Sequence, residues 1–180
     1  MAQNRHVGGG TNLGLLLAMI VILVIVVSLA IAYLPGAVQN AGITHVADDS
    51  ARRSAEQNLL ATDRKIALVA PKATRWGPGE SGTFSLSIAN KGPAEKAYYV
   101  SAYAESHPEG SPAEGWISVQ SPVIVPPESV KTSVLAVNTQ GSVPGTYTFR
   151  LLVCETEKCT RLNDPGVFVY DTVQFSIAIA

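Results

Sequence analysis

Residues Thr83 to Asn90 have the sequence TFSLSIAN, in which apolar and polar side chains alternate. This alternation indicates the structural class of the whole C-terminal region. Phe84, Leu86 and Ile88 alternate with serine and threonine, which is the period-two pattern of a strand with one buried face. A Gly-Pro-Gly turn at 77–79 precedes the segment, and an Asn-Lys-Gly-Pro turn closes it. We therefore expect a half-buried strand over residues 83–90.

Similar short segments follow one another on both sides of this strand. They are separated by Gly- and Pro-rich turns, and no helical pattern lies between them. The expected strands are 65–70, 97–105, 116–120, 123–125, 129–138, 146–155 and 167–179. This order indicates an antiparallel β-sandwich over residues 65–180, because a parallel α/β sheet would need crossover helices for which the chain has no room.

Four stretches resemble a known type of module: PGESGTFSLSIANKG, WISV, PPESVKTSVLAV and VPGTYTFRLLV. Together they are similar to the immunoglobulin-like sandwich domains of archaeal and bacterial surface and membrane-anchored proteins, the CARDB type above all. The resemblance covers roughly Val69 to Ala180. It implies an Ig-like sandwich and a tyrosine corner at Tyr147, which follows the turn Pro144-Gly145-Thr146 at a strand start.

The N-terminal part has a different composition. Leu13 to Leu34 is a run of 22 residues without a charge. As a helix it would be about 33 Å long, enough to cross the hydrocarbon core of a bilayer. Tyr33 and Pro35 suit the interface and the end of such a helix. We expect an N-tail at 1–12, a transmembrane helix at 13–34 in contact with membrane lipid, and the N-terminus inside.

Two alternatives remain open for this segment. Ala30-Ile31-Ala32 has the pattern of a signal-peptide cleavage site, although the apolar run is longer than a typical signal and stays apolar through that site. A prepilin leader cut near Gly8 to Gly10 is the other. The layout is similar to type IV pilin-like and archaellum-associated proteins, but residues 11–17 lack the glutamate usual in pilins and the leader has one arginine.

Residues 35–64 are expected to form a linker and a stalk helix. Ala47, Ala51, Ala55 and Leu59 recur every four residues, which is a helical stripe. Opposite charges four residues apart support an exposed helix. Because a stripe of alanines buries little apolar area, we expect a solvated helix without a partner, with an oligomerising spacer as the alternative.

Few residues carry candidate chemistry. Cys154 and Cys159 bracket a four-residue turn, and we expect a disulfide there, which favours an extracytoplasmic domain; free thiols or a metal site are the alternatives. The histidines at 6, 45 and 107 lie apart and are expected at the surface. Trp76 and Trp116 are expected to cover the core. No catalytic, metal, cofactor or small-molecule site is evident, and 13 basic against 14 acidic residues give no basic field for nucleic acid.

The sequence thus predicts a non-enzymatic, single-pass cell-membrane protein with an extracytoplasmic Ig-like β-sandwich. We expect it to act through a protein partner or self-association in adhesion or in the assembly of a surface complex. The alternative is a subunit or stator-like component of a pilin-like or archaellum-like filament.

Overall fold

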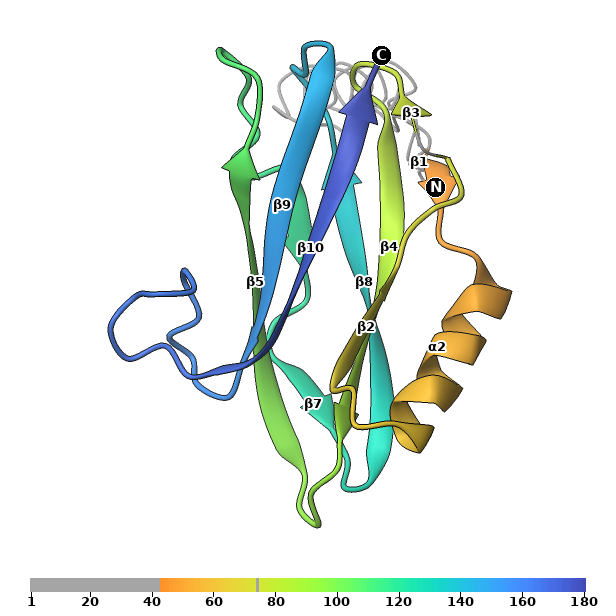
Figure 1. Ribbon diagram of the computed structural model, residues 1–180, viewed down its shortest axis with the longest axis vertical. Helices are drawn as coiled ribbons and strands as arrows, with labels where there is room; N and C mark the ends of the chain where they lie inside the picture. Colours follow the sequence, from red (N-terminus) through yellow and green to blue (C-terminus); the bar gives the residue numbers. More distant parts are fainter. Residues whose placement is uncertain (1–42, 74) are drawn as a thin grey trace, which may run out of the picture. The chain divides into compact units, whose positions relative to one another are not determined.

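Two five-stranded sheets packed face to face form the part of the chain that the computed structural model describes, residues 43–73 and 75–180 (Figure 1). One helix accompanies them. The elements in chain order are β1 (Ile43–Val46), α2 (Asp49–Ala61), β2 (Ile66–Val69), β3 (Arg75–Trp76), β4 (Ser81–Asn90), β5 (Lys96–Ser106), β6 (Ile117–Val119), β7 (Val123–Val125), β8 (Ser129–Asn138), β9 (Gly145–Cys154) and β10 (Val169–Ile179).

The first sheet has the order β1-β4-β8-β6, and β2 also pairs with β4. β1 and β2 share one edge of β4: β1 runs parallel to its first residues, and β2 runs antiparallel to residues 85–88. The second sheet has the order β3-β10-β9-β5-β7, and β9 and β10 pair along their whole lengths. Most pairs are antiparallel, as the short turns between the predicted strands require.

The core lies between the two sheets and follows the alternation of the sequence. Phe84, Leu86 and Ile88 of β4 are buried against a cluster that includes Phe149 and Leu151 of β9. The strand predicted at 83–90 is therefore confirmed as the larger part of β4. Trp76 and Trp116 are also buried in this cluster, as expected of residues that cover a core.

The other predicted strands are confirmed with ends that shift by at most two residues. Two strands were not predicted. β3 has only two residues, too few to show alternation, and β1 lies in the region assigned to the linker and the stalk helix. These two strands lie at the edges of their sheets, where each has one neighbouring strand.

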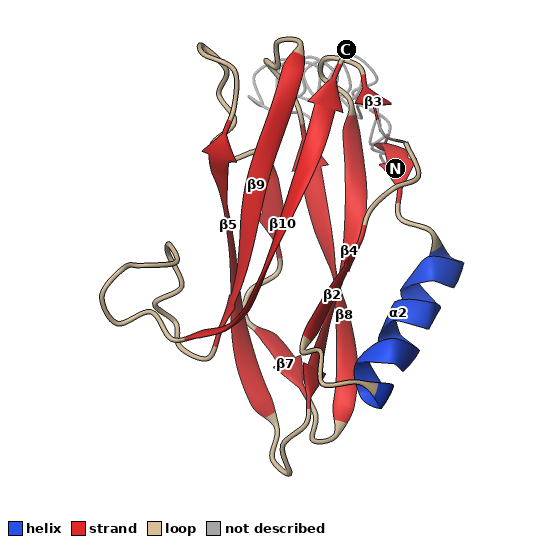
Figure 2. Cartoon of the chain, viewed as in Figure 1, coloured by secondary structure: helices blue, strands red, loops and turns tan. Residues whose placement is uncertain are grey.

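The stalk helix predicted within residues 35–64 is found as α2, but the expectation that it is solvated and without a partner is wrong. Asp48 begins it by accepting the backbone N–H groups of Ser50 and Ala51, a typical N-cap. The helix then runs along the outer face of the first sheet, against β2, β4 and β8 (Figure 2). Leu59 is only 1% exposed, whereas Leu60 is 60% exposed.

Small side chains on the sheet make room for this helix. Ser87 and Ala89 point to the outer face of β4, opposite to its core residues, and both are fully buried. Thr132 of β8 donates a hydrogen bond to Glu56 of the helix, with 2.6 Å between the oxygens, and its hydroxyl lies 2.7 Å from that of Ser87. Much of the predicted linker and stalk, residues 35–64, thus belongs to the folded domain.

The predicted N-tail and transmembrane helix, residues 1–34, lie outside the described residues. Within the described part of the chain, no helix is both long and apolar enough to cross a bilayer.

Candidate interaction surface

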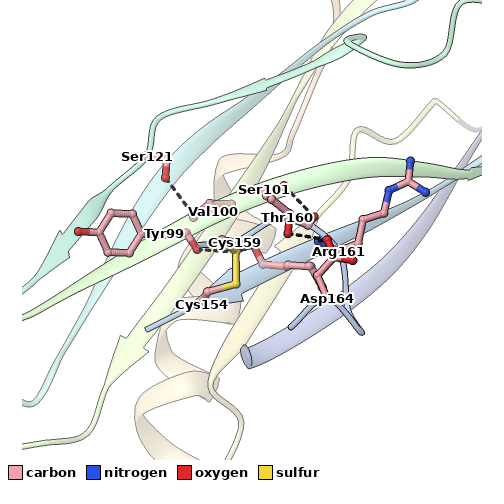
Figure 3. The surroundings of a disulfide bond; sticks show 10 residues. Tyr99, Val100, Ser101, Ser121, Cys154, Cys159, Thr160, Arg161 and Asp164 are labelled. Carbon is pink, nitrogen blue, oxygen red and sulfur yellow. Dashed lines mark hydrogen bonds between the residues drawn. A yellow bond between two sulfur atoms is a disulfide. The ribbon is translucent and has the colours of Figure 1, made fainter. Parts of the chain in front are cut away.

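A disulfide joins Cys154, the last residue of β9, to Cys159 in the following loop. The two sulfur atoms are 2.02 Å apart, and the closed loop is short because only five positions separate the cysteines. The sulfur of Cys159 lies 3.4 Å from the carbonyl oxygen of Tyr99 on the neighbouring strand β5 (Figure 3). The disulfide therefore holds the start of the β9–β10 loop against the outer face of the second sheet.

The loop of residues 155–168 covers an apolar side chain on that face. Leu152 alternates with the core residues Leu151 and Val153, so it points outward, yet it is fully buried. The loop is attached to β5 by two hydrogen bonds: Ser101 donates to the carbonyl of Thr160, and Tyr99 donates to Glu157.

An Asp-centred turn shapes the middle of the loop. Asp164 accepts the hydroxyl of Thr160 at 2.6 Å and the backbone N–H of Arg161 at 3.2 Å. The guanidinium of Arg161 then lies over the ring of Tyr103, 5.3 Å from its centre, and 3.5 Å from the carboxylate of Glu114. Both members of this ion pair are largely exposed, so it contributes at most about 1 kcal/mol.

The neighbouring part of the same face is polar, and the Glu105 carboxylate connects its side chains. Glu105 accepts hydrogen bonds from Arg150 and from the amide of Gln174, which joins three adjacent strands. The Glu105 carboxylate is also the main reason why the pKa of Arg150 is raised. This part of the sheet is thus a fixed polar surface beside the loop.

One large apolar side chain stands free at the end of the loop. Phe168 is 65% exposed, although its carbonyl accepts the backbone N–H of Glu155 and so fixes its position. Tyr99, Tyr103, Arg161 and Phe168 form what we call the disulfide-loop surface. Aromatic residues and arginine are enriched at protein–protein interfaces, and a loop held by a disulfide loses less entropy on binding.

Tyr147, for which the resemblance implied a tyrosine corner, lies apart from the cysteines. Its ring is fully buried near Trp116, and its hydroxyl donates to the carbonyl of Val143 and accepts the N–H of the same residue. This arrangement ties the loop before β9 to the core, which is a structural role. The cysteines instead hold a loop at the other end of β9.

His45 is not the surface residue that we expected. Its side chain is 14% exposed, its ring stacks on Trp76 with 4.6 Å between the ring centres, and its Nε2 lies 2.7 Å from the carboxylate of Glu80. A Cβ on Gly82 would lie 2.6 Å from the Trp76 ring and 2.7 Å from the carbonyl oxygen of His45, so only glycine fits there. These contacts hold β1 in the sheet. The spacing of residues along the chain contains no signal for these contacts.

We expect the contact between His45 and Glu80 to make the free energy of unfolding depend on pH. The hydrogen bond from His45, followed by that from the Gly77 backbone, lowers the pKa of Glu80 below its ordinary value of 4.5. A lowered carboxyl pKa contributes stability above the unfolded pKa, and this stability is lost as the pH falls through the folded pKa. The free energy of unfolding should therefore decrease as the pH falls below about 4.5.

Denaturant unfolding between pH 7 and pH 3 would measure this dependence, with Glu80→Gln as the comparison. The variant should lose less stability on acidification. The stability of the variant should still depend on pH to some extent, because hydrogen bonds from Lys72, Ser50 and Ala51 also lower the pKa of Asp48. Identical pH profiles for the two proteins would contradict the assignment.

No metal site is formed by the part of the chain that the structure describes. Within residues 43–73 and 75–180, no three His, Cys, Asp or Glu side chains lie close enough together to hold an ion.

The two sheets and the core between them define a β-sandwich protein. The sequence matches no protein-family model and no curated protein.

Solved structures with similar folds include a FixG-related protein from Vibrio parahaemolyticus, with a TM-score of 0.44, 10% identity, and coverage of 63% of this chain and 94% of that one. A CARDB domain from Pyrococcus furiosus has a TM-score of 0.39 and 14% identity, over 64% of this chain and 90% of that one. A family 123 glycoside hydrolase from Clostridium perfringens has a TM-score of 0.45 and 9% identity, over 59% of this chain and 23% of that chain.

Removing the disulfide should loosen the loop and leave the sandwich folded. For Cys154→Ala/Cys159→Ala we expect a loss of about 2 kcal/mol in the free energy of unfolding, because closing a short loop removes little entropy from the unfolded chain. Hydrogen exchange should accelerate in residues 155–168 and stay unchanged in β4 and β8. Equal acceleration throughout the domain would show that the disulfide supports the whole fold.

Proposed function

We propose that this chain is a membrane-anchored extracytoplasmic β-sandwich protein that takes part in assembling a cell-surface complex through protein–protein contacts. The observation that carries the proposal is the disulfide between Cys154 and Cys159 beside an exposed aromatic and cationic surface. Disulfides persist in oxidising compartments and are rare in the cytosol. The disulfide therefore supports a domain outside the cytoplasm.

The apolar run Leu13 to Leu34 supplies the anchor in this proposal. It is long enough for a bilayer, and its uncharged residues favour a lipid environment. Basic residues alone do not orient the span, because Arg5 precedes it and Arg52 and Arg53 follow it. The N-terminus inside therefore rests in this proposal on the disulfide, which favours a sandwich outside the cytoplasm. A single span then leaves the sandwich on the opposite side.

The disulfide-loop surface supplies the contact site. Phe168 and the Tyr103–Arg161 stack offer an aromatic and cationic surface that would be desolvated by a partner. Its residues do not combine a nucleophile, a base and an orienting group, so binding is the role that we propose.

Cysteine accessibility in intact cells tests the location. In the Cys154→Ala/Cys159→Ala background, Glu95→Cys places a thiol on the exposed β4–β5 turn, and Gln3→Cys places one in the N-tail. We expect a membrane-impermeant maleimide to label Glu95→Cys in intact cells and Gln3→Cys only after lysis. The reverse pattern, or no labelling of either before lysis, would overturn the proposal.

The N-terminal sequence of the mature protein distinguishes the anchor from its filament alternative. An intact N-terminus in a protein that needs detergent for extraction supports the anchor. A new N-terminus near Gly10 in filaments released by shearing would show instead that the chain is a filament subunit.

A further inference from the structure

An open cleft lies at the end of the sandwich where β8 ends and β9 begins. The loop between β5 and β6 and the loop between β8 and β9 border it, and both lie at the same end of the two sheets (Figure 1). Its volume is about 410 Å³, within the range of about 300–1,000 Å³ that is usual for small-molecule sites. The residues that line it include Pro112, Glu114, Trp116, Asn138, Gln140 and Gly141.

The two loops that border the cleft are fixed against each other. A Cβ on Gly141 would lie 3.2 Å from the Cγ of Pro112, and a Cβ on Gly145 would lie 2.5 Å from the Cγ of Pro108, so the loops are in close contact. The hydroxyl of Tyr147 also holds the β8–β9 loop through two hydrogen bonds to its backbone. Binding in the cleft would therefore require little ordering of its walls.

The side chains of Asn138 and Gln140 bring two carboxamide groups to the cleft. The Oδ1 of Asn138 accepts the backbone N–H of Gln140 at 3.1 Å, which fixes the orientation of this carboxamide. The NH₂ group of Asn138 and the side-chain amide of Gln140 form no hydrogen bond with any described residue. Both NH₂ groups can therefore donate to a ligand, and the side-chain carbonyl of Gln140 can accept from one.

One carboxylate lines the cleft as well. Glu114 lies 3.5 Å from the guanidinium of Arg161 in the disulfide loop, and its side chain is 62% exposed. The carboxylate keeps free acceptor positions, because its two oxygens can accept about four hydrogen bonds. None of the described residues that line the cleft is a lysine, an arginine or a histidine. The cleft thus offers donors and acceptors without a positive charge of its own.

Trp116 belongs both to the lining of the cleft and to the core, and it has an unused donor. The residue is 5% exposed, and its ring centre lies 4.5 Å from that of Tyr147. Its indole Nε1–H has no acceptor within the described part of the chain. Because buried polar groups nearly always have a hydrogen-bond partner, this N–H indicates that an acceptor binds nearby. A ligand hydroxyl in the cleft can supply it, directly or through one water molecule.

We propose that the cleft binds a neutral carbohydrate, whose hydroxyl groups accept from the amides of Asn138 and Gln140 and donate to the carboxylate of Glu114. Each sugar hydroxyl both donates and accepts, which suits a site that contains both kinds of group. The ring of Pro112 offers apolar area to the C–H groups of the sugar. An anionic ligand would meet a carboxylate and no cation, and an apolar ligand would leave the amides desolvated without partners.

The inference deepens the proposed function and rests on it for the source of the carbohydrate, which would be a glycan of the surface complex. The ion pair of Glu114 and Arg161 joins the cleft to the disulfide-loop surface, so one partner that carries a glycan can contact both. Binding of a free saccharide does not depend on where the domain is located. It can therefore be present or absent whatever the labelling in intact cells shows.

Titration of the full-length chain with neutral saccharides tests the cleft. The chain is purified in a detergent without a sugar headgroup, and disaccharides of glucose, galactose, mannose and N-acetylglucosamine are the probes. Saturation-transfer-difference NMR detects the contact, and tryptophan fluorescence gives the Kd. We expect at least one disaccharide to bind with a Kd below about 5 mM. Weaker binding by every disaccharide, or none, would overturn the proposal.

A matched pair of variants assigns the binding to the cleft. Gln140→Ala removes a side-chain amide from the cleft, whereas Gln57→Ala removes one from the exposed face of α2. Both residues are exposed, so both variants should fold, as circular dichroism can verify. We expect Gln140→Ala to raise the Kd about tenfold, through the loss of one or two hydrogen bonds, and Gln57→Ala to leave it unchanged. Equal Kd values for the two variants would refute the cleft as the site.

Vesicles then identify the source of the sugar. The full-length chain is reconstituted with and without a neutral glycolipid whose headgroup is the disaccharide that binds. Loss of free-disaccharide binding in the glycolipid vesicles would support the proposal with a lipid headgroup in the cleft. Unchanged binding would support it with a glycan that is free or attached to a protein.

Discussion

Replacing Leu59 by alanine is expected to lower the free energy of unfolding of the domain by about 3 kcal/mol, within the range measured for buried leucines. The side chain is 1% exposed between α2 and the outer face of the first sheet. Alanine would leave a cavity there, since the hydrogen bond between Thr132 and Glu56 keeps the helix close to the sheet. Urea unfolding followed by tryptophan fluorescence would measure the change.

Leu60 provides the control for this experiment. It neighbours Leu59 in the same helix, has the same helix propensity and is 60% exposed. Leu60→Ala should change stability by less than about 0.5 kcal/mol, as is usual for surface substitutions. Equal effects at both positions would mean that α2 is detached from the sheet in solution, as the sequence first indicated.

Replacing Tyr147 by alanine should have the largest effect of any single change considered, about 3–5 kcal/mol, because a fully buried aromatic ring is lost. Tyr147→Phe separates the contribution of the hydroxyl. It keeps the ring against Trp116 but leaves the N–H and C=O of Val143 without their partner. We expect it to cost about 1–3 kcal/mol.

Thermal and denaturant unfolding of the three proteins would give these differences. A Tyr147→Phe variant as stable as the wild type would show that Val143 finds other partners, and the tyrosine corner would then have no energetic role. An equal loss for alanine and phenylalanine would place the whole contribution in the hydroxyl.

The sandwich itself was predictable because its strands bury one face each. The alternation of Phe84, Leu86 and Ile88 with small polar residues indicates which face of β4 is buried in the core, and turns that contain Gly and Pro lie at its ends. The same pattern located β7 and β8 to the residue. These signals are local, so one sequence is enough to read them.

The position of α2 could not be read in this way. The alanine stripe indicated a helix, but the helix uses Leu59, Glu56 and Ala55 for its contacts and leaves Ala51 exposed. What fixes it is the small size of Ser87 and Ala89 on the outer face of a strand nearly thirty residues away. Contacts between distant segments leave no periodic signal in either segment.

The disulfide-loop surface also depends on contacts between distant segments, which residue spacing does not predict. The spacing of Cys154 and Cys159 predicted their disulfide, but neither the stacking of Arg161 on Tyr103 nor the burial of Leu152 follows from the spacing of residues. They depend on how the loop folds back over β5. His45 likewise gains its partners only because β1 pairs with β4.

The chain enters the sandwich through β1, whose first residue pairs with the start of β4. His45 adds its contacts with Glu80 and Trp76 to this pairing. Tension applied to the chain before Ile43 would therefore act first on β1, at the edge of its sheet, and only afterwards on the paired strands of the core.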